Sequence, residues 1–172
     1  MSRAHASPHY SAAVRISISG RGVRGRVSSL LAFRRPDRLF VEIPGPGGVR
    51  MQALARDGQL MALFPGEGAV YRGESSAEEF DALFGVPLAP ADVMDLLVGA
   101  QPQRVASLRV WWGALWPERV EARLAGGGKL ELRIEEPDGS PVADRAFEFP
   151  AVDPALYRSI DAAEARRLWG GR

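Results

Sequence analysis

The segment over residues 30–48 constrains the fold more than any other, because two strand patterns meet there at a tight corner. Leu39, Val41 and Ile43 occupy every second position, which is the pattern of a strand with one buried face. Pro36 cannot donate a hydrogen bond to a neighbouring strand, so it belongs at the corner. The segment therefore predicts two adjacent strands in an antiparallel sheet.

The same alternation recurs on both sides of this segment. Six strands joined by short turns are predicted before residue 73, as an up-and-down meander. Asp57-Gly58 is the clearest turn signal, typical of a two-residue type I′ hairpin. More strands are predicted over residues 105–112, 118–124, 129–135 and 145–149. About ten to eleven strands in one sheet would curl rather than stay flat.

Two short helices interrupt the strand pattern in the middle of the chain. Ser76 and Glu79 have the spacing of a capping box, and Gly85 is a typical helix end. A second helix is predicted over residues 90–98. Neither is long enough to be stable alone, so both are expected to lie on the sheet. A third short helix is predicted near the C-terminus, over residues 162–169.

The expected fold is mainly β (α+β): a curled antiparallel sheet that forms an unclosed half-barrel, with the two mid-chain helices as a lid over its concave face. A chain of 172 residues is most simply one domain, here residues 13–172, preceded by a flexible polar segment over residues 1–12. That segment lacks the apolar stretch of a signal peptide, although a mature piece of an exported precursor would look the same.

Composition excludes several classes of function. The net charge of +1 lacks the basic excess of a nucleic-acid-binding protein, so no nucleic acid partner is expected. The chain has no cysteine, and its two histidines, His5 and His9, lie in the N-terminal segment. The folded body therefore offers no thiolate site and no histidine-based triad or metal site. We expect no catalytic residue, no metal and no cofactor, and hence a protein that is not an enzyme; in the alternative, an enzyme on this scaffold would have to work with carboxylates, arginines and tyrosines only.

Several short phrases resemble the LolA/LolB group of bacterial lipoprotein carriers and related LolA-like domains. They are FRRPDRL over residues 33–39, DGQL over 57–60, LFP over 63–65 and YRG over 71–73. The order of meander, helical insertion and meander over residues 14–149 is similar too. The resemblance implies an unclosed barrel with a helical lid, located in the periplasm or at the outer membrane. The lipidated cysteine of the outer-membrane members is absent here; a lipoprotein that has lost its signal peptide and lipidated Cys would look the same.

The resemblance also implies a function without catalysis: binding lipid or lipoprotein acyl chains for transfer to, or insertion in, the outer membrane. Expected partners are lipid or acylated protein cargo and the outer-membrane surface. The cavity candidates are the apolar positions of the strands: Ile16, Ile18, Val27, Leu31, Phe33, Leu39, Val41, Ile43, Leu108, Val110 and Leu132. The lid candidates are Phe80, Leu83, Phe84, Val93, Leu96 and Leu97. The same alternation is also typical of a permanently packed core, and both interpretations stay open.

A group of aromatic residues near the turn at residues 111–117 suggests a second hypothesis. Trp112, Leu115 and Trp116 are candidates for contact with a membrane or a partner. The protein would then be an envelope assembly factor or sensor that binds a protein partner through this Trp-rich loop or through a sheet edge. In the alternative interpretation, one or two of the tryptophans belong to the core, where large aromatic side chains supply buried area.

Overall fold

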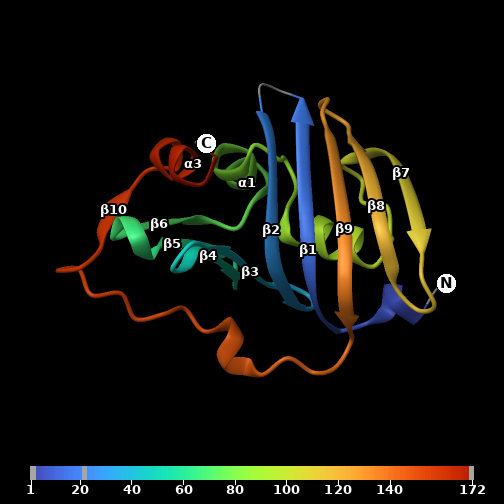
Figure 1. Ribbon diagram of the computed structural model, residues 1–172, viewed down its shortest axis with the longest axis horizontal. Coiled ribbons are helices and arrows are strands. Elements are labelled where there is room, and N and C mark those ends of the chain that lie inside the picture. The colour runs from blue at the N-terminus through green and yellow to red at the C-terminus, as the bar shows by residue number, and fades with distance from the viewer. Residues whose placement is uncertain (1–2, 21–22, 171–172) are drawn as a thin grey trace.

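The computed structural model describes residues 3–20 and 23–170 of the chain. In this part of the chain, ten strands form one curled sheet that does not close, in the order β10-β6-β5-β4-β3-β2-β1-β9-β8-β7. All neighbours are antiparallel except β10 and β6, which are parallel. Figure 1 shows the sheet bending around the helices α1 and α2. The predicted unclosed half-barrel with helices over its concave face is confirmed.

The first half of the chain is the predicted meander, with each strand pairing with the next. The bounds are β1 (His9–Gly20), β2 (Val23–Arg34), β3 (Arg38–Gly45), β4 (Gly48–Arg56), β5 (Gln59–Phe64) and β6 (Ala69–Glu74). Asp57 and Gly58 join β4 to β5 with φ angles of 52° and 75°. Both values lie in the left-handed region that a type I′ turn requires, so this hairpin prediction is confirmed.

The lid helices are α1 (Ala77–Phe84) and α2 (Pro90–Leu97), which lie between β6 and the returning strands. The Ser76 hydroxyl accepts a hydrogen bond from the Glu79 amide at 3.2 Å, which confirms the predicted helix start. Gly85 ends α1 in the left-handed conformation, with φ of 72°. The strands β7 (Val105–Trp112), β8 (Pro117–Leu124) and β9 (Lys129–Asp138) follow, and β9 pairs with β1.

The first strand begins earlier than the sequence suggests. Residues 9–12 pair with the end of β2, starting from His9 opposite Arg34, and Tyr10 is completely buried. A short 3₁₀ helix, η1 (Arg3–Ala6), precedes them. Residues 9–12 thus belong to the sheet and not to the flexible segment expected over residues 1–12. The reason is that the alternation of β1 continues backwards through the small Ala12 to Tyr10, which a search for large aliphatic residues passes over.

The predicted strand over residues 145–149 is wrong. These residues form the 3₁₀ helix η3 (Asp144–Phe147) and part of an extended segment, residues 139–157, that we call the C-terminal strap. In Figure 1 the strap runs from β9 past β3 and β4 to β10 (Arg158–Ile160). Phe147 is fully buried against Ala32 and Leu54, on the face of the sheet opposite the lid. The strand-like apolar pattern of residues 145–149 therefore reflects packing onto a face of the sheet and not pairing with a neighbouring strand.

The last helix in the described part of the chain is the third predicted one, α3 (Ala162–Gly170). The Asp161 carboxylate accepts a hydrogen bond from the Glu164 amide at 2.8 Å and caps it. The main hydrophobic core lies between the concave face of the sheet and the helices α1, α2 and α3. None of the helices in the described residues is long and apolar enough to cross a membrane.

Candidate functional site

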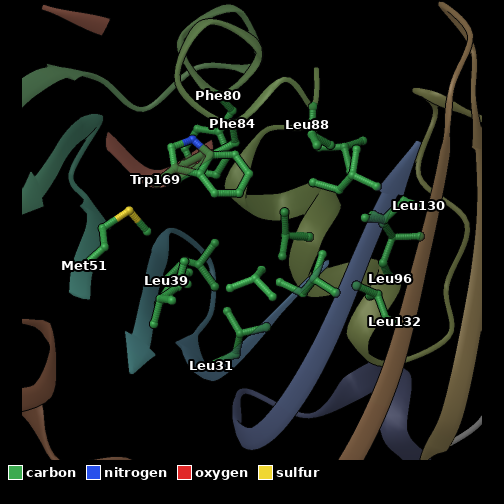
Figure 2. A pocket seen from close by; sticks show the side chains of 17 residues that line it. Leu31, Leu39, Met51, Phe80, Phe84, Leu88, Leu96, Leu130, Leu132 and Trp169 are labelled. Atoms are coloured by element: carbon green, nitrogen blue, oxygen red, sulfur yellow. The ribbon is translucent and has the colours of Figure 1, made fainter. Parts of the chain in front are cut away.

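An apolar cavity of about 100 Å³ lies inside the main core, between the concave face of the sheet and the three helices. Figure 2 shows its lining side chains, all of which are apolar. The strands contribute Ile16, Ile18, Val27, Leu31, Leu39, Val41, Ile43, Met51, Leu130 and Leu132. The helices and the connection between them contribute Phe80, Phe84, Val86, Leu88, Val93, Leu96 and Trp169. The site therefore offers dispersion contacts and exclusion of water, and no charged or catalytic group.

Most of the candidates from the sequence line this cavity. Every predicted strand residue does so except Phe33, Leu108 and Val110. Of the lid candidates, Leu83 and Leu97 lie outside the lining, although both are completely buried. They anchor α1 and α2 in the core instead of facing the cavity.

The three strand candidates outside the cavity are displaced by the geometry of the sheet. Phe33 stacks on Tyr10 with 5.2 Å between ring centroids, and Tyr10 in turn contacts the edge of Trp116. This aromatic group packs in the main core next to the cavity wall. Leu108 and Val110 are half-buried in β7, the edge strand of the sheet. Their side chains follow the same alternation as the cavity residues, but β7 lies too many strands away from the cavity for them to reach it.

The sequence interpretation missed five of the lining residues as site candidates: Met51, Val86, Leu88, Leu130 and Trp169. Leu130 and Met51 follow the strand alternation and could have been included on that ground. Val86 and Leu88 lie in the connection between α1 and α2, which has no periodic pattern. Trp169 lies near the end of α3, and only the packing of α3 against α1 brings it to the cavity.

Polar contacts at the rim hold the helices over the cavity. Arg35 pairs with Asp95 of α2 at 2.8 Å, and both side chains are partly exposed. The Asp92 carboxylate accepts from the Ala89 amide at 2.8 Å and pairs with Arg104 at 3.2 Å. These bonds orient α2 without placing any charge among the lining residues.

The third helix closes the cavity from another side. The indole N–H of Trp169 donates a hydrogen bond to the main-chain carbonyl of Leu83. Its ring meets the edge of Phe84 with 5.5 Å between centroids, and Phe84 meets Phe80 in the same way. In Figure 2 these three aromatic side chains lie together above the strand residues. Both α1 and α3 must therefore move if this side of the cavity is to open.

The volume sets a limit on what the cavity can hold in this conformation. A cavity of about 150 Å³ lined by similar side chains holds one benzene molecule. At about 100 Å³ this one admits only a few carbon atoms. A longer chain needs more room than this, and movement of the lid helices away from the sheet would supply it.

The aromatic group at the other end of the molecule divides into exposed and buried members. Trp112 is 43% exposed and Leu115 is 68% exposed, at the hairpin between β7 and β8. Trp116 is half-buried and packs against the core through Tyr10. Trp116 thus follows the core interpretation, whereas Trp112 and Leu115 are exposed and their contact with a membrane or partner stays a prediction.

Titratable groups lie outside the cavity. Burial raises the pKa of the Tyr10 hydroxyl above its usual range, because the charged form would lose its hydration. Within residues 3–20 and 23–170, no group of three or more histidine, aspartate or glutamate side chains is placed to hold a metal ion.

Comparison with known proteins shows similarity to solved structures, whereas no family model and no curated protein matches the chain. A DUF1329 family protein from Desulfovibrio piger matches with a TM-score of 0.50 and 14% identity, over 88% of this chain and 94% of that chain. An uncharacterized conserved protein from Thermus thermophilus matches with a TM-score of 0.50 and 12% identity, over 91% of this chain and 93% of that chain. This chain shares the fold of these two solved structures.

A LolA superfamily protein from Nitrosomonas europaea is also similar, with a TM-score of 0.46 and 12% identity, over 84% of this chain and 91% of that chain. The architecture that the resemblance implied, an unclosed curled sheet with helices over its concave face, is confirmed. At these identities the likeness extends to the fold alone, so the function has to be argued from the site.

Proposed function

We propose that the protein binds the acyl chain of a lipid or of an acylated protein between its concave sheet face and its helices, without catalysing a reaction. The wholly apolar lining of the cavity carries this proposal. An acyl chain gains about 0.8 kcal/mol for each methylene that leaves water for such surroundings. No other group in the cavity offers a different kind of interaction.

Binding a full chain requires the lid to open. The helices α1 and α2 have eight residues each, too few to be stable apart from the sheet. The partly exposed ion pair between Arg35 and Asp95 contributes about 1 kcal/mol or less. Opening of the lid is thus opposed mainly by the loss of apolar contacts between the lid helices and the sheet. An entering acyl chain makes apolar contacts with both and so offsets that loss.

The resemblance to the LolA/LolB group supports a place for this activity. We infer that the protein acts in the bacterial periplasm or at the outer membrane, where it delivers its cargo to the membrane. Fractionation of the native host with an antibody against the chain tests this inference. Recovery with the cytoplasmic fraction would contradict it.

The experiment for acyl binding compares two valine substitutions by native mass spectrometry with palmitate. Val41→Phe puts a larger side chain into the cavity, whereas Val110→Phe adds the same atoms at a half-buried strand position outside it. We expect wild type and Val110→Phe to bind palmitate, and Val41→Phe to bind it at least tenfold more weakly. Equal binding by all three proteins, or binding by none, would contradict the proposal.

A second function is favoured by the exposed side chains of Trp112 and Leu115. On this hypothesis the protein binds a protein partner through the hairpin between β7 and β8, as an assembly factor or sensor of the cell envelope. Replacing Trp112 with Ala and Leu115 with Ser should abolish partner capture and leave palmitate binding unchanged. Trp116 is kept in this test, because its contact with Tyr10 makes it part of the core.

A further inference from the structure

An acyl chain in the cavity must leave its polar head at an opening, because no lining side chain is charged. Met51 of β4 and Trp169 of α3 both line the cavity, and Figure 2 labels both side chains. Their chain neighbours Arg50 and Leu168 line a separate crevice of about 660 Å³. The apolar cavity and this crevice are therefore separated by little more than one strand and one helical turn.

A β-bulge places a cation at this boundary. The register between β3 and β4 shifts next to Arg50, which leaves it without a partner across the two strands. Bulges of this kind redirect a side chain from the regular face of a sheet. The Arg50 guanidinium donates to the main-chain carbonyls of Trp169 at 2.9 Å and Leu168 at 3.3 Å. It is thus held beside the residue that closes the cavity.

The charge of the crevice is positive on balance. Its lining includes Arg50 and Arg167, and neither guanidinium lies within 4 Å of a carboxylate of the described residues; the Glu164 carboxylate, which pairs with Arg158, also acts on Arg167. Within residues 3–20 and 23–170, Glu67 is the one acidic residue that lines the crevice, and its charge also acts on Arg158. The guanidinium of Arg50 uses one nitrogen for the two carbonyls, so its other N–H groups are free to bind an anion.

The crevice is also open enough for a head group. It is bordered by the loop over residues 45–48 and by the turn over residues 65–67. A Cβ atom added at Gly47, Gly48 or Gly66 would meet no atom within 4 Å. The borders are therefore largely main chain with free space beside it, and leave the two arginines accessible.

We propose that this crevice receives the anionic head, a carboxylate or a phosphate, of the amphiphile whose acyl chain lies in the apolar cavity; this inference rests on the proposed function. Arginine presents planar N–H donors that match both kinds of anion. The ligand is then an anionic lipid, since a neutral head would leave the two charges unused.

The test measures the dissociation constants of three ligands with the same chain: tetradecyl phosphate, tetradecanoate and tetradecanol. Wild type is compared with the double variant Arg50→Gln, Arg167→Gln. Arg166→Gln serves as the matched control, since Arg166 lies on α3 but does not line the crevice. Because Arg50 also caps the C-terminal end of α3, Arg50→Lys is included to keep the charge while changing the hydrogen bonds.

We expect wild type, Arg166→Gln and Arg50→Lys to bind at least one of the anions about tenfold more tightly than the alcohol, a preference that falls with added salt. The double variant should bind all three ligands alike, with its affinity for tetradecanol unchanged. The proposal is overturned if wild type shows no preference, or if the double variant keeps it; acyl binding would then stand alone. Failure of all three ligands to bind wild type would refute both the proposed function and this inference.

Discussion

Shortening Leu96 to alanine should destabilise the protein and at the same time improve acyl binding. Leu96 is completely buried on α2 and lines the cavity. A buried Leu→Ala substitution costs about 2–5 kcal/mol, depending on how much empty volume remains. Because the vacated space joins an existing cavity and stays open, we expect a loss in the upper part of this range, about 3–5 kcal/mol.

The space that opens in Leu96→Ala adjoins the cavity, and the ligand can use it. Room for about two more methylenes would tighten binding by about 1–2 kcal/mol. At saturating ligand, the free energy of unfolding should therefore rise by that much more in the variant than in wild type. Leu54→Ala is the control, because Leu54 is also buried but lies on the other face of the sheet, under Phe147.

The assay is urea unfolding followed by far-ultraviolet circular dichroism, with and without dodecanoate below its micellar concentration. Wild type and Leu54→Ala should gain the same stability from the ligand, and Leu96→Ala should gain more. If dodecanoate stabilises Leu96→Ala no more than it stabilises Leu54→Ala, the cavity is not where the chain binds.

Three further predictions concern the surroundings of the site. The Tyr10 hydroxyl is buried without a hydrogen-bond partner in the described structure, so Tyr10→Phe should raise the free energy of unfolding by about 1 kcal/mol. Burial raises the pKa of Tyr10 in the folded state above its unfolded value of 10.0, so the free energy of unfolding should be unaffected by this group below pH 10 and should fall as the pH rises above it. Tyr10→Phe should lack this alkaline loss of stability in a pH series of urea melts. Arg35→Met breaks the pair with Asp95 and should cost about 1 kcal/mol or less, yet speed amide hydrogen exchange throughout α2; unchanged exchange would show that the pair does not hold the lid. Gly99→Ala should destabilise by more than about 1 kcal/mol in thermal melts, because Gly99 has φ of 76° and a Cβ there would lie 2.7 Å from the Trp112 ring; a variant as stable as wild type would contradict this geometry.

The strands and the lid could be predicted because their signals are local. Alternation such as that of Leu39, Val41 and Ile43 shows which face of a strand is buried, and it can be recognised from the residues of that strand alone. The start of α1 at Ser76 follows from a side chain that bonds an amide three residues later. The same alternation placed most of the cavity residues, because a curled sheet has only one concave face.

The C-terminal part of the site could not be predicted in this way. Phe147 and its neighbours show strand-like spacing, but their partner is a sheet face formed by residues about 90 positions earlier, such as Leu54. Trp169 was placed on a helix correctly, yet its contact with Phe84 depends on the path of the strap around the sheet. Phe33 is an error of another kind. It lies on the concave face, as the alternation predicts, but it stacks on Tyr10 and does not line the cavity.

Fluorescence quenching tests most directly whether an acyl chain occupies the cavity beside Trp169. In a variant with Trp111, Trp112 and Trp116 replaced by Phe, Trp169 is the sole tryptophan and lines the cavity. A fatty acid brominated near the middle of its chain quenches only a tryptophan that it contacts. We predict saturable quenching of Trp169 that unbrominated palmitate reverses. Unquenched Trp169 at ligand concentrations that bind the protein would contradict binding of the acyl chain in this cavity.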